Sequence, residues 1–242
     1  MPRYFLELAY KGTQYSGFQT QKNANSIQAE VEKAFETLHR QPVVLTGSSR
    51  TDAGVHALQN YFHFDFEKEI NPQWQYKLNA ILPRDIVLKS LREVAPDAHC
   101  RFDAVSREYK YFIYRKKDPF LEDRAYYFPY KLDRERMQEG ADILREYEDF
   151  TSFSKRNTQV KSFFCRIRES EWTEEGGCLV YRVKADRFLR GMVRALTATM
   201  LKLGRGKLDL AEFRRAIEAK DCTRASFAVP PHGLFLMGVE YG

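Results

Sequence analysis

The most unusual stretch of the chain reads Thr46-Gly47-Ser48-Ser49-Arg50-Thr51-Asp52-Ala53-Gly54-Val55-His56-Ala57. It lies between two segments with strand character and combines small residues with one acid and one arginine. Gly47 and Gly54 permit backbone conformations that are closed to other residues, so this segment can approach a ligand closely. Taken alone, the same residues also describe a connecting loop in which Asp52 caps the next turn and Arg50 neutralises it.

Outward from this loop, the periodicity of hydrophobic residues predicts strands alternating with helices. Strands are expected at residues 3–10, 59–67, 86–94, 109–114, 162–172, 179–185 and 234–241. Helices are expected at residues 27–38, with Asn25 or Ser26 as N-cap, and at 74–82, 132–145, 189–203 and 208–219. In the strand 59–67, alternation puts Phe62 and Phe64 on one face and Tyr61 and His63 on the other.

These elements predict the α+β class, with a mainly antiparallel sheet flanked by helices. The two halves of the chain have comparable orders of elements and are joined near residues 97–105. We therefore expect two related α/β halves that share one central sheet, namely residues 1–103 and 104–242.

Composition places the chain among ordinary globular proteins that can bury a core, with 242 residues, 43% hydrophobic and 30% charged. No apolar run approaches the roughly 20 residues of a membrane span. The N-terminus has an acid, Glu7, inside its short apolar stretch and makes a poor signal peptide, so a cytoplasmic protein without membrane contact is expected. A net charge of +6 and a pI near 9.0 favour a polyanionic partner such as nucleic acid without proving one.

Four cysteines and five histidines are scattered along the chain without the close pairs that usually bind zinc, so no metal site is predicted. The glycine patterns of dinucleotide-binding and phosphate-binding loops are also missing.

Residues 50–57, Arg-Thr-Asp-Ala-Gly-Val-His-Ala, resemble the signature of the tRNA pseudouridine synthase A family, in which the aspartate is the essential catalytic residue. Further stretches resemble family motifs in the same order: residues 10–19, 107–111, 149–153, 188–194, 203–206 and 230–234. The chain departs from the family pattern at Ser49 (commonly glycine), Lys11 (aspartate), Phe18 (tryptophan) and Val229 (alanine).

The resemblance implies the pseudouridine synthase fold and a site in a cleft between the halves. Asp52, Arg50 and Arg194 would form its catalytic set, with Arg194 pairing with the aspartate and Arg50 also contacting RNA. Tyr109 would stack on the uracil ring. The resemblance further implies a cofactor-free homodimer that acts on the tRNA anticodon stem-loop, at positions 38, 39 and/or 40.

Pseudouridine formation breaks the N1–C1′ bond of uridine and rejoins the base through C5. Asp52 could attack C1′ as a nucleophile or remove a sugar proton as a base; in both cases it must be ionised, and a nearby cation favours the charged form. The uridine must first be flipped out, at a cost of a few kcal/mol that stacking on Tyr109 would offset.

Each of these residues also has a simpler interpretation. Tyr109 could be a buried core tyrosine, because Tyr111 shares its face of the strand. Arg194 could be a helix arginine that faces water, and Arg50 the local counter-ion of Asp52. His56 is expected to be structural. Four more cations could contact phosphates or form a solvated face: Lys184, Arg187, Arg190 and Arg205.

Two other functions compete with the isomerase. One is a non-catalytic RNA-binding relative, which the presence of Asp52 disfavours. The other is a metal-dependent nuclease or phosphatase, which would need several carboxylates near the loop, whereas Asp52 is the only acid between His39 and Asp65.

Overall fold

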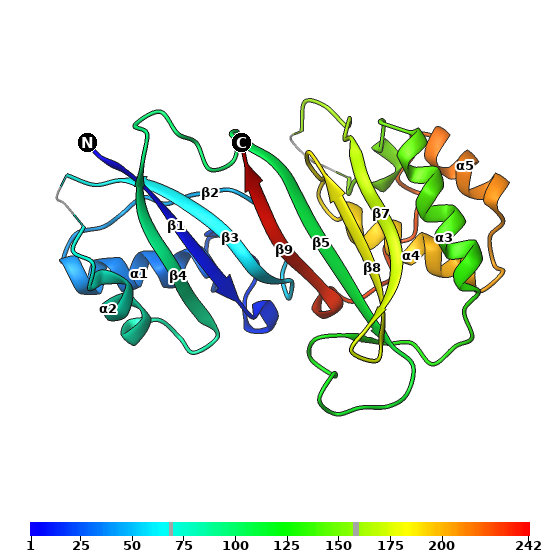
Figure 1. Cartoon of the computed structure of the whole chain (residues 1–242), viewed down its shortest axis with the longest axis horizontal. Coiled ribbons are helices and arrows are strands. Elements are labelled where there is room, and N and C mark those ends of the chain that lie inside the picture. Colours follow the sequence, from blue (N-terminus) through cyan, green and yellow to red (C-terminus); the bar gives the residue numbers. More distant parts are fainter. Residues whose placement is uncertain (68–69, 157–159) are drawn as a thin grey trace. The chain divides into compact units, whose positions relative to one another are not determined.

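The chain folds into two compact units, each an antiparallel sheet with helices (Figure 1). The computed structural model describes residues 1–67, 70–156 and 160–242. Unit 1 comprises Met1–Val105 and Leu236–Gly242, and unit 2 comprises Ser106–Phe235. The α+β class and the mainly antiparallel pairing expected from the sequence are confirmed.

Unit 1 is built on four long strands in the order β4-β1-β3-β9, and the short β2 pairs with β3. Its strands are β1 (Arg3–Tyr10), β2 (Thr46–Gly47), β3 (His56–Asp65), β4 (Ile86–Val94) and most of β9 (Leu234–Tyr241). Its helices are α1 (Ile27–His39) and α2 (Trp74–Ile81), with a 3-10 turn at Gly12–Gln14. Ser26 is the N-cap of α1, as expected, since its hydroxyl accepts a hydrogen bond from the backbone N–H of Ala29.

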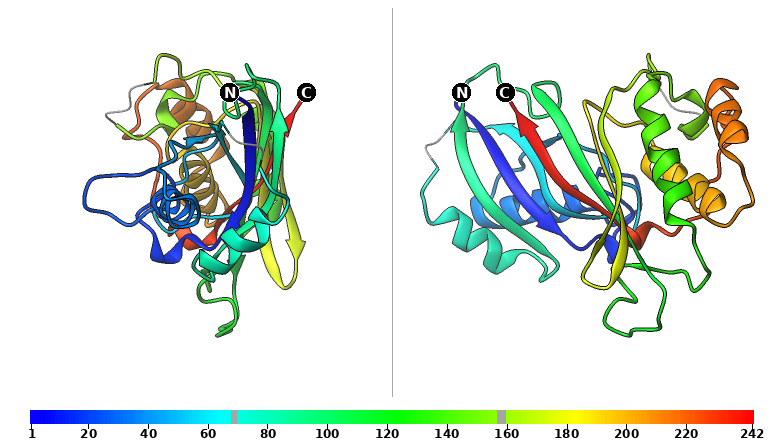
Figure 2. Two further views of the ribbon diagram at one scale, coloured as in Figure 1. Left: turned by 90° about the vertical axis from the view of Figure 1, so that its left-hand side faces the viewer. Right: turned by 45° about the vertical axis from the view of Figure 1, so that its right-hand side comes forward.

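The central strand β3 is buried on both faces. Phe64 on one face meets Phe35 of α1 edge-to-face, with ring centroids 5.1 Å apart. Figure 2 shows α1 against one face of the unit 1 sheet. On the other face Tyr61 packs against Tyr241 at 5.2 Å. Such double burial keeps β3, and the loop that precedes it, in a fixed position.

Unit 2 contains three paired strands in the order β5-β8-β7, and β6 runs parallel to β5. Its strands are most of β5 (Ala104–Tyr114), β6 (Tyr126–Tyr127), β7 (Ile167–Glu175) and β8 (Cys178–Ala185). Its helices are α3 (Arg134–Ile143), α4 (Met192–Gly204) and α5 (Leu210–Glu218), with 3-10 turns at Leu144–Glu146, Thr151–Phe153 and Pro231–Gly233.

Several boundaries in unit 2 differ from the sequence prediction, among them the starts of β5, β7 and α4. The strand expected at 162–172 begins only at Ile167, because the preceding residues bond to another segment: Phe163 O accepts from Phe150 N, and Cys165 N donates to Glu148 O. Helix α4 begins at Met192 instead of residue 189, because Gly191 adopts a left-handed conformation with φ of 75°. Only two residues of α4, Arg194 and Lys202, are not buried, so this helix is the core element of unit 2.

Candidate active site

The loop that carries Asp52 joins β2 to β3 and is anchored at both ends. Ser49, Thr51 and Val55 are buried, whereas Arg50 is exposed and Asp52 is half-buried. Buried neighbours therefore fix the loop, while Arg50 and part of Asp52 are accessible to solvent. Arg50 and Asp52 thus lie on the same loop, as the sequence predicted.

The segment at residues 10–19 forms the support of this loop through backbone hydrogen bonds. Phe18 N donates to Thr51 O at 3.1 Å, and Gly54 N donates to Tyr15 O at 3.3 Å. The two motifs, about 30 residues apart in the sequence, are therefore joined into one structural unit.

A further contact joins Gly12 to His56, the residue at the start of β3. Gly12 N donates to Nδ1 of the buried His56 at 3.1 Å. A Cβ at Gly12 would overlap the carbonyl oxygen of Val55, so only glycine allows the two backbones to approach this closely. His56 has the structural role expected for it, as an acceptor that holds the N-terminal segment.

A buried polar network holds the residues next to Asp52. Asn60 Nδ2 on β3 donates to Ser49 O at 2.9 Å and to the Tyr10 hydroxyl at 3.1 Å, and that hydroxyl lies 2.8 Å from Thr51 Oγ1. Because an unpaired buried polar group costs about 1–3 kcal/mol, these bonds favour one loop conformation over others. The hydroxyl of Ser49, at the position of the family glycine, is buried and has no hydrogen-bond partner among the residues that the structure describes.

Phe18, which replaces the family tryptophan, is fully buried next to this network. Its ring stacks on Phe62 of β3 with centroids 4.4 Å apart and lies 5.8 Å from the ring of Tyr10. The aromatic side chain at this position is thus part of the core that supports the loop.

In unit 2, Tyr109 lies on β5, where its backbone pairs with Val183 of β8. Its side chain is only 8% exposed, and its ring meets Phe188 edge-to-face at 5.1 Å. Tyr111 on the same face is fully buried and donates its hydroxyl to Pro230 O at 2.7 Å. Tyr109 is thus buried, as its simpler interpretation expected, and Tyr111 beside it belongs fully to the core.

Arg194 lies in the first turn of α4 and does not simply face water. Its Nε and Nη2 both donate to Val229 O, at 3.1 and 2.7 Å. Burial raises the pKa of Tyr111, and the nearby charge of Arg194 acts in the opposite direction. Because a carbonyl is neutral, these two bonds orient the guanidinium of Arg194 without cancelling its charge.

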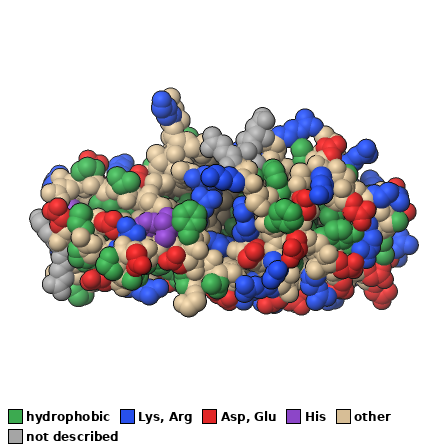
Figure 3. Space-filling view, turned by 90° about the horizontal axis from the view of Figure 1, so that it is seen from above, with side chains coloured by type: hydrophobic (Ala, Val, Ile, Leu, Met, Phe, Trp, Pro, Cys, Tyr) green, Lys and Arg blue, Asp and Glu red, His purple; other side chains and the backbone are tan. Residues whose placement is uncertain are grey.

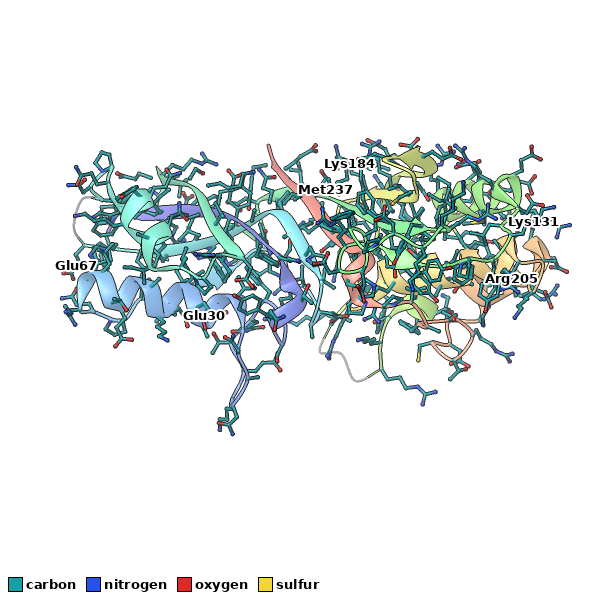
Figure 4. The ribbon with its side chains drawn as sticks, turned by 90° about the horizontal axis from the view of Figure 1, so that it is seen from below. Glu30, Glu67, Lys131, Lys184, Arg205 and Met237 are labelled. Carbon is teal, nitrogen blue, oxygen red and sulfur yellow. The ribbon has the colours of Figure 1, made fainter. Side chains whose placement is uncertain are left out.

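The other predicted phosphate contacts are not gathered at one place. Arg205 stacks on Tyr130, with its guanidinium carbon 4.0 Å from the ring centroid, whereas Lys184 lies on β8 (Figure 4). On the face seen in Figure 3, lysine and arginine side chains are interspersed with acidic ones over unit 2. On that face, charge alone therefore does not outline an RNA-binding surface of unit 2.

Comparison with known protein families identifies the family of the chain. The family model described as tRNA pseudouridine synthase matches residues 8–103 and 147–242. The chain belongs to the tRNA pseudouridine synthase family. This isomerase family is the one that the motifs predicted, and its match covers Asp52, the supporting residues 10–19 and Arg194.

Similar proteins extend the match over the full length of the chain. A tRNA pseudouridine synthase A from Parabacteroides distasonis is 47% identical over 243 residues, which cover all of this chain and 96% of that protein. The corresponding protein from Porphyromonas gingivalis is 48% identical over all of this chain and 98% of its own length. One from an Exiguobacterium species is 40% identical over 100% of this chain and 98% of that protein.

Within the described residues, no helix is both long enough and apolar enough to cross a membrane. In the same part of the chain, no three or more His, Cys, Asp or Glu side chains are grouped so that they could hold a metal ion.

Sequence reasoning missed the residues that position the loop. Tyr10 lay inside a motif, but nothing in the motif distinguished a hydroxyl contact from a core aromatic ring. Asn60 was a polar residue within an alternating strand and gave no sign of its burial or of its three bonds to the loop and Tyr10.

Proposed function

We propose that the protein isomerises uridine to pseudouridine in the anticodon stem-loop of tRNA, at positions 38, 39 and/or 40. The observation that supports this most directly is the loop of Arg50 and Asp52, held by a buried network, in a chain of the tRNA pseudouridine synthase family. A carboxylate that must meet C1′ of a flipped nucleotide needs a fixed backbone beneath it, because small misplacements cost large factors in rate.

In this proposal Asp52 is the catalytic carboxylate, acting on the sugar as nucleophile or as base. The N1–C1′ bond breaks, the uracil turns, C5 bonds to C1′, and the hydrogen of C5 is lost as a proton while N1 gains one. No group enters or leaves the substrate in the net reaction, and no cofactor is required for it.

The proposal also gives roles to three other residues. Arg194, oriented by Val229 O, would stabilise the charged form of Asp52. Tyr109, whose ring contacts Phe188, would stack on the flipped base. The exposed Arg50 would contact the RNA and help to hold the flipped state. A site built from both halves of the chain, residues 1–103 and 104–242, belongs to the same proposal.

The test is tritium release from tRNA labelled at uridine C5, with purified protein and no added metal or nucleotide. Wild-type protein should release tritium, whereas Asp52→Ala should release none and still bind tRNA. Substantial release by Asp52→Ala would remove the central claim. Release that disappears with EDTA would instead favour metal-dependent chemistry, and tRNA binding without release would favour a non-catalytic RNA-binding relative.

We further propose a cytoplasmic homodimer, the assembly that the family resemblance implies. Light scattering coupled to gel filtration should give twice the 28.4 kDa of one chain. A monomeric mass at micromolar concentration would contradict it.

A further inference from the structure

Unit 2 contains a pocket of about 320 Å³ to which the proposed reaction assigns no role. This volume is within the range of pockets that hold small ligands. Residues from three stretches line it, among them Thr151, Ser154, Lys155, Arg156, Phe163 and Lys220.

The lining of this pocket is positively charged. Lys220 Nζ lies 2.9 Å from a carboxylate oxygen of Asp149, so its charge is largely balanced. Arg156 is exposed, and its Nε donates to the sulfur of Cys222 at 3.4 Å, a contact that leaves the guanidinium charge in place. Lys155 adds a second cation.

Among the described residues of the lining, Asp221 is the acid, and its carboxylate bonds within its own turn. Its Oδ1 accepts from Thr223 N at 2.9 Å and its Oδ2 accepts from Thr223 Oγ1 at 2.7 Å. These bonds lower the pKa of Asp221, and the positive charges of Arg224 and Arg156 act in the same direction. Both carboxylate oxygens of Asp221 thus accept hydrogen bonds from Thr223. The guanidinium of Arg156 donates to a sulfur and can also bind an anion.

Phe163 gives the pocket an aromatic wall. The ring is half-buried, and its backbone is held by the bond from Phe150 N to Phe163 O at 3.1 Å. An aromatic face beside cations is the combination with which proteins bind single-stranded RNA, since every base can stack and every linkage carries a charge.

The pocket is joined directly to the motif that carries Arg194. Lys155 N donates to Arg190 O at 3.0 Å, and the stem of Lys155 lies along Gly191, the residue before α4. A strand of RNA that reaches Arg190 is therefore next to the wall of the pocket.

We propose that this pocket binds one nucleotide of the tRNA other than the reacting uridine, with its phosphodiester on Arg156 and Lys155 and its base against Phe163. The inference rests on the proposed function, because it takes tRNA as the substrate.

The first test compares tRNA affinity and its salt dependence for Arg156→Gln and Phe163→Leu, with Arg136→Gln as the control. Arg136 is an exposed arginine of α3 that does not line the pocket, so its loss removes the same charge from the same unit. Loss of Arg156 should lower the slope of log Kd against log salt by about 0.7–0.9, the value for one phosphate contact. Phe163→Leu should raise Kd about fivefold or more without changing that slope. Variants no different from Arg136→Gln would overturn the proposal.

The second test uses Cys222 as a reporter, since Cys100, Cys165 and Cys178 are buried. Alkylation of Cys222 by iodoacetamide, read from the mass of its peptide, should slow when tRNA binds and stay unchanged with inorganic phosphate. Protection by phosphate alone would indicate a small-anion site, and no protection by bound tRNA would indicate an unused pocket; either result would overturn the proposal.

Tritium release by the same proteins separates this inference from the proposed function. A wild-type protein that releases no tritium, but whose Cys222 is protected by tRNA, would refute the reaction and support the pocket. Active wild-type protein together with an Arg156→Gln variant that matches the control would refute the pocket alone.

Discussion

The hydroxyl oxygen of Tyr10 lies 2.8 Å from Oγ1 of Thr51, and both side chains are buried. Thr51 directly precedes Asp52, so this bond connects the end of β1 to the residue next to the proposed catalytic carboxylate. Tyr10 also accepts from Asn60, which binds the backbone of Ser49. The segment next to Asp52 is thus held by three buried side chains, those of Tyr10, Thr51 and Asn60.

Tyr10→Phe should separate the support of the loop from its chemistry. The change leaves Thr51 without its tyrosine partner, and we expect the free energy of unfolding to fall by about 1–2 kcal/mol. The kcat for tritium release should fall more than the affinity for tRNA, because the segment that carries Asp52 is loosened. Urea denaturation and single-turnover assays measure the two effects, with the exposed Tyr76→Phe as control. An unchanged kcat in a destabilised protein would show that the network serves stability only.

Gly12→Ala should be among the most damaging of the small substitutions. The added methyl group would meet the carbonyl of Val55, which belongs to the backbone and cannot rotate away, and the bond from Gly12 N to His56 would be strained. A cost of about 1–3 kcal/mol or more is expected, with a matching loss of tritium release. Gly238→Ala is the matched control, because a Cβ there makes only an ordinary contact with Gln59. Equal melting temperatures for the two variants would contradict this account.

Regular elements were predictable where hydrophobic periodicity and capping residues agreed. The bounds of β1, β4 and β9 match the expected residues 3–10, 86–94 and 234–241, and Ser26 caps α1 as expected. Prediction failed at residues 162–166, since apolar residues there pair with residues 148–150 in place of β8. Which partner a short apolar segment pairs with depends on tertiary packing, and periodicity carries no information about it.

In the candidate site, too, local motifs were predictable from the sequence and tertiary contacts were not. Asp52 and Arg50 could be selected because a long motif surrounds them, and Arg194 because another motif contains it. The contact of Arg194 with Val229 O joins residues 35 positions apart, and the burial of Asn60 depends on strands that meet only after folding. Sequence patterns identify residue types at local spacings, so they could not reveal which residues support the site.

Acid should destabilise the protein through His63. Burial is the main cause that lowers the pKa of His63 to about 4, and the positive charges of His99 and Arg3 lower it further. The negative charges of Asp65 and Asp103 act in the opposite direction. In the unfolded chain a histidine has a pKa near 6.5. Between these values the unfolded state binds a proton that the folded state does not, so the free energy of unfolding falls as pH decreases from about 6.5 to 4.

The measurement is the urea midpoint of wild-type protein and His63→Gln across that pH range. His63 Nδ1 lies 3.2 Å from Cys100 Sγ and 3.4 Å from Cys100 N, which donates to it, so glutamine can replace the acceptor without a titrating group. The midpoint of the wild type should decrease more steeply than that of the variant. Parallel curves would show that other groups dominate the acid transition.

Arg194→Gln tests whether the cation at the start of α4 acts on the reaction or only on the fold. Glutamine can still donate to Val229 O, so the bond that holds the loop before Pro230 is partly kept while the charge is lost. We expect kcat to fall about 100-fold, a usual loss when one electrostatic contact of a reaction centre is removed. Arg194→Lys should recover part of this rate, whereas Lys202→Gln, an exposed cation near the other end of the same helix, should have no effect. If Arg194→Gln lowers the melting temperature but retains kcat, the arginine holds Val229 and has no part in the chemistry.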